Sequence, residues 1–240
     1  MPRLDVLVTK SGLAESRERA QALIVAGKVK VAGETVRRPD RSVSEDASIA
    51  VDAEPGYASR GALKLAPALE RFGVDPAGRV CADIGASTGG FTDVLLRRGA
   101  SKVYAIDVGR GLLHWRLRQD PRVVVIERVN ARDLDTLPER ISLVVIDVSF
   151  ISLEKILPAV RRAASDAEVV ALFKPQFEVG RSEVGKGGIV RNAAAVETAL
   201  ARFRQWCAAG GFDILAEAPS EVAGADGNRE FFLHLRPVAP

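Results

Sequence analysis

Four charged residues border apolar or helix-like runs in this chain, where they could do acid–base chemistry. They are Lys64, Asp147, Lys174 and Glu230. If the fold brings them to one cleft, a lysine can take a proton and a carboxylate can orient that lysine. Each charge taken singly is more often a solvated surface group, because charged residues commonly flank strands. The pattern therefore indicates proton-transfer chemistry only if the four converge.

A glycine-rich segment follows the apolar run that ends at Ile84 and leads into a helix-like stretch. It reads Gly85-Ala-Ser-Thr-Gly-Gly-Phe91. Glycines permit a tight turn and close approach of a ligand to the backbone, and the helix that follows offers free amide groups. The G-x-G-x-x-G spacing of dinucleotide enzymes is absent. A glycine turn that serves packing alone is the simpler alternative.

Two carboxylates indicate which nucleotide-like ligand this segment would take. Asp83 stands before the first glycine, where it can receive an ammonium group rather than repel a pyrophosphate. Asp107 closes the next apolar run, where an acid suits the hydroxyls of a ribose. Together they favour S-adenosylmethionine (SAM) over NAD. Asn130 would lie beside the adenine of the cofactor or, alternatively, form a turn. The expected cofactor contacts are Asp83, Gly85, Ser87, Thr88, Gly89, Gly90, Phe91, Asp107 and Asn130.

Apolar runs and helix-like stretches alternate from Ser59 onward and must position these residues. Strands are predicted at 80–84, 102–107, 123–127, 143–147, 169–173, 214–218 and 231–235. Helices are predicted around 63–72 and over 89–98, 152–164 and 193–209. This alternation predicts an α/β fold with a mostly parallel sheet covered on both faces. Ligands of such sheets bind at the carboxyl ends of the strands.

The first part of the chain has a different pattern. Ser16 can cap a helix over Arg17–Ala26, which Gly27 ends with a left-handed turn. Valines then alternate with lysines over 28–31 before a turn, which predicts a short hairpin with a basic outer face. A mixed acidic stretch, 42–55, closes this small α+β module.

Positive charge is concentrated in that module. Residues 1–41 hold nine Lys or Arg against five Asp or Glu, whereas the formal net charge of the whole chain is +3. This indicates an anionic partner.

Cys81 and Cys207 lack the spacing of a metal site, so we expect no metal and two buried thiols. The start lacks a secretory signal pattern and no apolar run of about 18 residues occurs, so we expect a cytoplasmic protein without membrane contact.

Five blocks of the chain resemble the TlyA/hemolysin A family: Tyr57–Leu65, Asp83–Asp93, Asp147–Ser152, Phe173–Glu178 and Gly185–Arg191. More broadly, residues 63–240 resemble the FtsJ-type ribose 2′-O-methyltransferases, whose K-D-K-E tetrad matches Lys64, Asp147, Lys174 and Glu230. Residues 1–55 resemble an S4 domain, and residues 56–62 form the linker between the two domains. The linker segment Pro55-Gly-Tyr-Ala58 departs from the family, which often has an Arg and a Trp there.

The resemblance implies a Rossmann-like SAM methyltransferase sheet with a small N-terminal α+β S4 domain. It implies transfer of the SAM methyl group to a cytidine 2′-oxygen of ribosomal RNA. Lys174 would be the base, with Lys64 as the neighbouring cation. Asp147 would orient Lys174, and Glu230 would hold the ribose or steer Lys64. Such an in-line displacement depends on alignment of the oxygen, the methyl carbon and the sulfur.

S4 modules bind structured RNA, so the expected partner is ribosomal RNA, free or in assembled subunits, and we expect the protein to be a monomer. Phosphate contacts would make the affinity salt-sensitive. The target nucleotide would be unstacked into the cleft, where Phe150 is a stacking platform or alternatively a core residue. The expected RNA contacts are Arg3, Lys10, Arg17, Arg19, Gln21, Lys28, Lys30 and Arg60.

Three rival functions follow from other features. Gly180–Lys186 fits the P-loop spacing, although Gly187 replaces the Ser or Thr that binds magnesium. A membrane-active hemolysin would fit the family label, but the sequence shows no basic amphipathic helix that would support this function. A nonenzymatic RNA-binding or ribosome-assembly factor would have kept the fold and lost the chemistry. His114 and Trp115 invite a catalytic role, for which local packing is the alternative.

Overall fold

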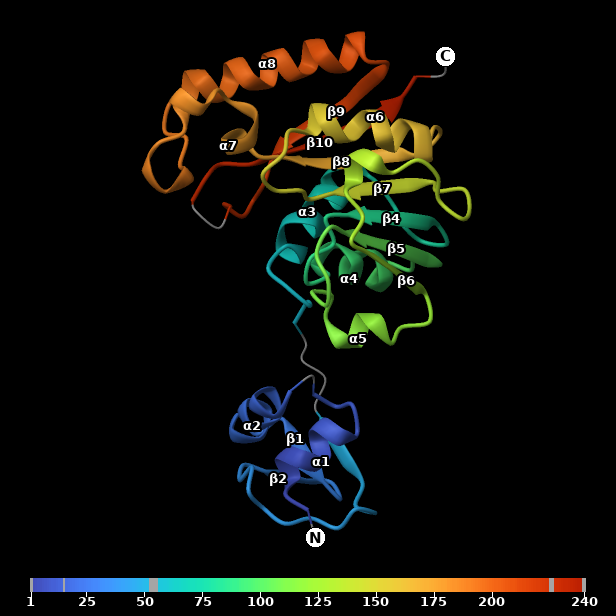
Figure 1. Ribbon diagram of the computed structural model, residues 1–240, viewed down its shortest axis with the longest axis vertical. Coiled ribbons are helices and arrows are strands. Elements are labelled where there is room, and N and C mark those ends of the chain that lie inside the picture. Colours follow the sequence, from blue (N-terminus) through green and yellow to red (C-terminus); the bar gives the residue numbers. More distant parts are fainter. Residues whose placement is uncertain (1, 15, 52–55, 225–226, 239–240) are drawn as a thin grey trace. The chain divides into compact units, whose positions relative to one another are not determined.

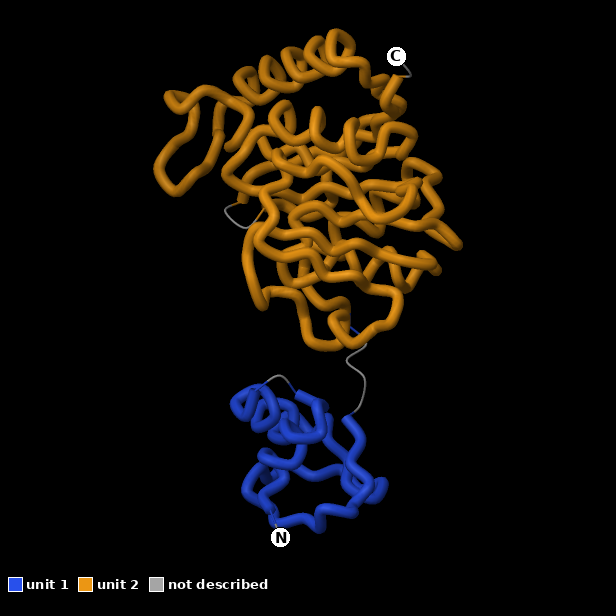
Figure 2. Tube along the Cα trace, turned by 45° about the vertical axis from the view of Figure 1, so that its right-hand side comes forward, with its two compact units in different colours: residues 1–56 blue, residues 57–240 orange. Residues whose placement is uncertain are grey.

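The chain forms two compact units, residues 1–56 and residues 57–240 (Figure 2). The computed structural model describes residues 2–14, 16–51, 56–224 and 227–238. Each unit encloses hydrophobic core of its own. Pro55, at the start of the divergent linker segment, lies outside the described residues.

Unit 1 packs two helices against a three-stranded antiparallel sheet. Its elements are α1 (Leu4–Lys10), α2 (Arg17–Val25), β1 (Val29–Val31), β2 (Glu34–Val36) and β3 (Ile49–Val51). Ser16 caps α2 as predicted, since its hydroxyl accepts a hydrogen bond from the Arg19 amide at 3.1 Å. Gly27 then turns the chain with φ +73°, where a side chain would be strained.

Two elements of unit 1 correct the sequence-based prediction. The helix α1 was not predicted, because its seven residues are too short to show a clear period. The stretch 42–55 was expected only to close the module, yet it contains β3, which pairs with β1 (Val31 opposite Ile49). Pairing on both sides of β1 gives its backbone N–H and C=O groups hydrogen-bond partners and lets the sheet cover the apolar face of the helices.

Unit 2 is built on a seven-stranded sheet in the order β6-β5-β4-β7-β8-β10-β9 (Figure 1). The strands are β4 (Val80–Ile84), β5 (Lys102–Asp107), β6 (Val123–Glu127), β7 (Leu143–Ile146), β8 (Glu168–Phe173), β9 (Phe212–Pro219) and β10 (Phe231–Pro237). The pairings from β6 to β8 are parallel, and β10 runs antiparallel to both of its neighbours. The mostly parallel sheet predicted from the alternation is confirmed.

Helices cover both faces of this sheet. They are α3 (Ala62–Phe72), α4 (Gly90–Arg97), α5 (Trp115–Arg118), α6 (Leu153–Ala163), α7 (Pro175–Glu178) and α8 (Ala193–Ala209). Side chains alternate along the strands, so Val144 packs with α6 and α8 while Val145 packs with α3 and α4. Burial on both faces explains why these strands are continuous apolar runs.

The strand order places a switch point between β4 and β7. The chain leaves β4 toward β5 and β6 on one side, and it leaves β7 toward β8 on the other. Ligands of open α/β sheets bind at such a point, outside the carboxyl ends of the strands. Because β10 is antiparallel, residue 230 before it lies at that same edge, beside the end of β8 (Phe231 opposite Phe173).

Two rival interpretations can be compared with this fold. A P-loop runs directly from a strand into a helix, whereas Gly180–Lys186 follows α7 and leads into the 3-10 turn Lys186–Gly188. The P-loop hypothesis is therefore wrong. In the described part of the chain, every helix is too short or too polar to cross a membrane.

Candidate active site

The glycine segment makes its turn against the end of β7. Gly85 has φ +83°, and a Cβ there would overlap the carbonyl oxygen of Asp147. A Cβ at Gly90 would likewise overlap the Ser59 side chain in front of α3. These close approaches place the loop after β4 beside the loop after β7, at the switch point of the sheet.

Asp107 holds this loop through its carboxylate. Its Oδ2 accepts a hydrogen bond from the Ser87 amide at 2.8 Å, and its Oδ1 accepts one from the Gly109 amide at 2.7 Å. Carboxylate oxygens have further lone pairs, so the group can still accept hydrogen bonds from a ligand. Asn130 caps the 3-10 turn Ala131–Asp133, which confirms the turn-forming role considered for it.

Two cavities meet at these loops. The larger, about 700 Å³, is lined by the predicted cofactor residues Gly85, Ser87, Asp107 and Asn130 and also by Asp147. The smaller, about 250 Å³, is lined by Lys64, Thr88, Gly90, Lys174 and again Asp147. Gly85, Ser87, Asp147 and Ser149 line both. The expected ligand site and the expected reactive lysines are thus adjacent.

The four charged residues form two lysine–carboxylate pairs. Lys64 Nζ donates to Glu230 Oε2 at 2.6 Å, and both side chains are largely shielded from solvent. Lys174 Nζ lies 2.5 Å from Asp147 Oδ1 and donates to Ser149 Oγ at 2.9 Å. The contact between Lys174 and Asp147 is an ion pair without hydrogen-bond geometry. Among the described residues, Asp147 Oδ1 accepts no hydrogen bond, so the ion pair with Lys174 is its charged contact.

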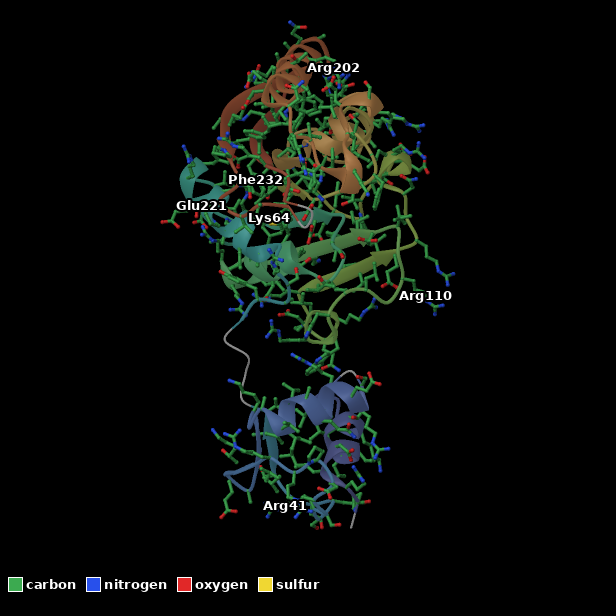
Figure 3. The ribbon with its side chains drawn as sticks, turned by 90° about the vertical axis from the view of Figure 1, so that its left-hand side faces the viewer. Arg41, Lys64, Arg110, Arg202, Glu221 and Phe232 are labelled. Carbon is green, nitrogen blue, oxygen red and sulfur yellow. The ribbon has the colours of Figure 1, made fainter. Side chains whose placement is uncertain are left out.

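Each of the four comes from a different element. Lys64 extends from α3, whose buried face packs under the sheet, and Figure 3 labels it within unit 2. Asp147 and Lys174 follow β7 and β8, which are neighbouring parallel strands. Glu230 precedes β10 and is buried beneath Gly224, where a Cβ would crowd its carboxylate. Sequence-distant residues meet because the ends of β7 and β8 and the starts of α3 and β10 lie together.

Three predicted cofactor residues lie behind the cavity walls or in the core. Asp83 is fully buried and lines neither described cavity. Gly89 has φ +94° and packs against Leu117, so its small size serves contact with α5. Phe91 borders the smaller cavity, but its ring is buried and lies 6.1 Å from that of Phe232.

Asp83 nevertheless has the electrostatics of a cation receptor. Its Oδ2 accepts a hydrogen bond from Thr92 Oγ1 at 2.6 Å, while its Oδ1 has no donor among the described residues. Burial raises the pKa of Asp83 to about 7, and the nearby Asp147 adds to the shift. A cationic ligand close by would stabilise the ionised carboxylate. Together with Asp107 and the Gly85 turn, this fits a nucleoside with a cationic tail.

Several residues of the site were missed by the sequence-based reasoning. Ser149 accepts the hydrogen bond from Lys174, and Glu178 accepts bonds from Leu153 N at 2.8 Å and Ser152 Oγ at 2.7 Å. Both lie inside the family-like blocks, but no charge pattern marks Ser149, and Glu178 resembles a surface acid of a short helix. Arg132, Lys155 and Arg181 add positive charge to the larger cavity.

Phe150 is exposed, so the alternative of a core residue is wrong. Its side chain is 91% exposed, and its backbone has φ +65°, a strained conformation for a side chain of this size. Its ring centroid lies 5.2 Å from that of Phe177. Both rings line the larger cavity, which makes this pair an aromatic surface at its rim.

His114 and Trp115 lie where packing explains them. His114 Nδ1 accepts a hydrogen bond from the Arg116 amide at 3.2 Å and so caps α5, and its ring stacks on that of Trp115. Neither residue lines the two cavities. Arg110, nearby in sequence, projects from the outer edge of unit 2 (Figure 3).

The predicted RNA contacts divide between the units. Arg60 is exposed and lines the smaller cavity. Arg3, Lys10 and Arg17 are exposed on unit 1. The other predicted contacts of unit 1 are half-buried: Arg19, Gln21, Lys28 and Lys30.

Comparison with known proteins gives matches over both units. A family model described as FtsJ-like methyltransferase matches residues 57–237, and one described as S4 domain matches residues 2–49. The 16S/23S rRNA (cytidine-2′-O)-methyltransferase TlyA of Mycobacterium tuberculosis is 49% identical, over 98% of this chain and 89% of that protein. Hemolysin A of Brachyspira hyodysenteriae is 42% identical, over 97% of this chain and 99% of that protein.

A solved structure gives the same result in three dimensions. It is named as a hemolysin candidate from Streptococcus thermophilus and superposes with a TM-score of 0.73 at 42% identity. The match covers 98% of this chain and 88% of that one. The resemblance inferred from the sequence blocks is confirmed. The chain belongs to the TlyA/hemolysin A family, in which an S4 domain precedes an FtsJ-like methyltransferase domain.

Proposed function

We propose that this chain transfers the methyl group of SAM to the 2′-oxygen of a cytidine in ribosomal RNA. The observation that carries the proposal is the pair of lysine–carboxylate contacts, Lys64 with Glu230 and Lys174 with Asp147, beside the larger cavity. The relative from M. tuberculosis is named for this reaction. We infer a cytoplasmic monomer that acts on free ribosomal RNA or on assembled subunits.

The larger cavity would hold the cofactor. The Asp107 carboxylate would accept hydrogen bonds from the ribose hydroxyls, and Asn130 would lie beside the adenine. Asp83 would stabilise the cationic amino-acid end from behind the loop, because its Oδ1 has no donor among the described residues. When bound, SAM supplies a methyl group on a positively charged sulfur; a ribose oxygen in line with the carbon–sulfur bond can take the methyl group, and the sulfur leaves as a neutral thioether.

Lys174 would take the proton of the ribose hydroxyl. A lysine accepts a proton only as the neutral amine. Lys64 would be the neighbouring cation, since both lysines line the smaller cavity. Asp147 and Ser149 would aim Lys174 Nζ, and Glu230 would hold Lys64 in place.

Phe150 would receive the unstacked target base. Single-stranded bases stack on aromatic rings, and such stacking tolerates any base. The ring of Phe150 is almost fully exposed, and its strained backbone turns it toward the rim of the larger cavity beside Phe177. The cations Lys155 and Arg181 on the same cavity would neutralise flanking phosphates.

Two measurements test the proposal. Calorimetry of the full chain with SAM should give one site, weakened by Asp107→Asn. Mapping of 2′-O-methyl groups in ribosomal RNA from cells with and without the protein should give at least one cytidine that is methylated only with it. Absence of SAM binding would favour the nonenzymatic assembly factor instead. Binding without any difference in ribose methylation would place the substrate outside ribosomal RNA.

A further inference from the structure

A buried carboxylate lies under the basic surface of unit 1. Asp5 is in the first turn of α1 and has no solvent exposure. Its Oδ1 accepts a hydrogen bond from Arg3 Nε at 3.1 Å. Its Oδ2 accepts three more, from Arg3 Nη2 at 3.0 Å, Arg17 Nε at 3.0 Å and Gln21 Nε2 at 2.7 Å. One carboxylate therefore joins the start of α1 to the first two turns of α2.

The partners keep this carboxylate ionised despite its burial. The hydrogen bond from Arg3 holds the pKa of Asp5 well below its usual range, and those from Gln21 and Arg17 lower it further against the effect of burial. Two guanidinium groups and one carboxylate leave the cluster with a net charge of +1. Without Asp5, two like charges would stand close together and repel each other.

The outer edges of both guanidinium groups remain available. The side chains of Arg3 and Arg17 are 45% and 53% exposed. Arg17 uses only its Nε toward Asp5, and its two Nη atoms make no hydrogen bond to the described residues. Arg3 Nη1 likewise makes no hydrogen bond to the described residues. Such fixed, planar donors match the oxygens of a phosphate group.

We propose that Asp5 is a positioning residue that holds Arg3, Arg17 and Gln21 as a preformed site for one RNA phosphodiester. The inference rests on the proposed binding of RNA and adds an acid to the residues on which that binding depends. Because the arginines are already ordered, RNA binding would not have to immobilise two long side chains.

Asp5→Asn separates this role from simple electrostatics. The variant keeps the side-chain shape and raises the net charge by one, so long-range attraction alone predicts tighter RNA binding. The positioning role predicts weaker binding, by about tenfold near physiological salt, as two phosphate-facing groups lose their alignment. The slope of log affinity against log salt concentration should also fall by about one.

The experiment uses the full chain and a transcript of bacterial 23S ribosomal RNA as the probe. Asp40→Asn is the matched control, because Asp40 is an exposed partner of Arg38 in the same unit and the charge change is identical. The control should bind equally well or more tightly. In an Arg3→Ala/Arg17→Ala background, Asp5→Asn should cause no further loss, since Asp5 acts through the arginines.

A second variant guards against unfolding of unit 1. Arg17→Lys keeps the charge and leaves Asp5 in place, but lysine cannot bind the carboxylate and a phosphate with separate, fixed donors. It should weaken RNA binding several-fold with unchanged circular dichroism. In methylation assays the KM for RNA should rise for both variants, while kcat and SAM affinity stay at the wild-type values.

The outcomes are distinct. A folded Asp5→Asn variant that binds the transcript like Asp40→Asn would overturn the positioning role, as would an Arg17→Lys variant with wild-type affinity. Failure of the wild-type chain to bind the transcript at any salt concentration would overturn the proposed action on free ribosomal RNA. A loss of kcat at saturating RNA would mean that Asp5 acts on the chemistry and not on RNA contact.

Discussion

At the scale of single residues, Lys174 is held by an ion pair with Asp147 and a hydrogen bond to Ser149, at the junction of two cavities. Lys174→Ala removes the proposed base and leaves the residues expected to hold SAM untouched. We expect kcat to fall roughly 10²- to 10⁴-fold, while SAM affinity measured by calorimetry changes little.

The control for this prediction is Lys102→Ala. Lys102 begins β5 at the opposite edge of the sheet and pairs with Glu139 at 2.5 Å, so its loss should leave kcat unchanged. If Lys174→Ala kept near-normal turnover while binding SAM and RNA, the assignment of the base would be wrong.

Glu178 gives a prediction about stability. It is the last residue of α7 and accepts hydrogen bonds from Leu153 N and Ser152 Oγ at the start of α6, and burial raises its pKa to about 7. A carboxyl whose pKa is raised on folding binds a proton more tightly in the native state than in the unfolded state. The native state is therefore favoured at low pH, and this contribution is lost as pH rises from about 4.5 to about 7.

Glu178→Gln should remove this dependence, because the amide keeps the shape and one acceptor without the charge. We expect the free energy of unfolding of the wild type to lose on the order of 3 kcal/mol, relative to the variant, between pH 4.5 and pH 8. Urea titrations at several pH values measure the difference. Parallel curves for the two proteins across this range would show that Glu178 has no raised pKa.

At the scale of elements, the regular part of the fold was predictable. The strands β4 and β5 have the predicted bounds, because strands buried on both faces are unbroken apolar runs. The edge strand β6 and the helix α8 also have the predicted bounds. The short elements α1, β3 and α7 were missed, since three to seven residues carry too little periodic signal. Their formation depends on contacts with distant residues, such as the pairing of β3 with β1.

The candidate site was predictable to a similar degree. Strand ends at one edge of a parallel sheet must lie together, which is why Asp147 and Lys174 were found in sequence. How residues pair depends on side-chain packing. The contact of Lys64 with Glu230 was one of two alternatives in the sequence-based reasoning, and that of Lys174 with Ser149 came only from the structure. The burial of Asp83 behind the loop likewise has no sequence signal.

Gly85 tests how the loop after β4 is positioned. Ala at this position would be strained at φ +83° and would overlap the Asp147 carbonyl oxygen. We expect Gly85→Ala to lower the free energy of unfolding by more than the roughly 1–2 kcal/mol of a left-handed alanine. SAM affinity should fall about tenfold or more, because the turn moves away from the cavity.

Gly73→Ala is the matched control for Gly85→Ala. Gly73 ends α3 with φ +66°, and no atom would contact a Cβ there. Gly73→Ala should lower the stability measured by thermal unfolding, because alanine is strained in the left-handed conformation. It should keep SAM affinity at the wild-type value. Equal SAM affinity in the two variants would contradict the proposed close approach at Gly85.

At the scale of the whole molecule, we expect RNA affinity to come mainly from unit 1 and chemistry from unit 2. Lys28→Ala/Lys30→Ala removes two cations from unit 1. The slope of log RNA affinity against log salt concentration should become shallower by about 1.5, with SAM affinity unchanged. Filter binding across a salt series measures the slope.

A double variant in unit 2, Arg140→Ala/Lys102→Ala, removes the same charge at the edge of the sheet opposite the site. It should leave the salt slope close to that of the wild type. Equal changes in slope for the two double variants would indicate that net charge, rather than the surface of unit 1, governs RNA affinity.

The chemical identity of the product decides whether the chain methylates a ribose of ribosomal RNA. The purified full chain is incubated with unmodified ribosomal RNA and SAM labelled in its methyl group, and the RNA is digested to nucleosides and analysed by mass spectrometry. We expect label in 2′-O-methylcytidine, on the ribose and at no base. Label on a base, or no labelled nucleoside from a chain that binds both SAM and RNA, would contradict this prediction.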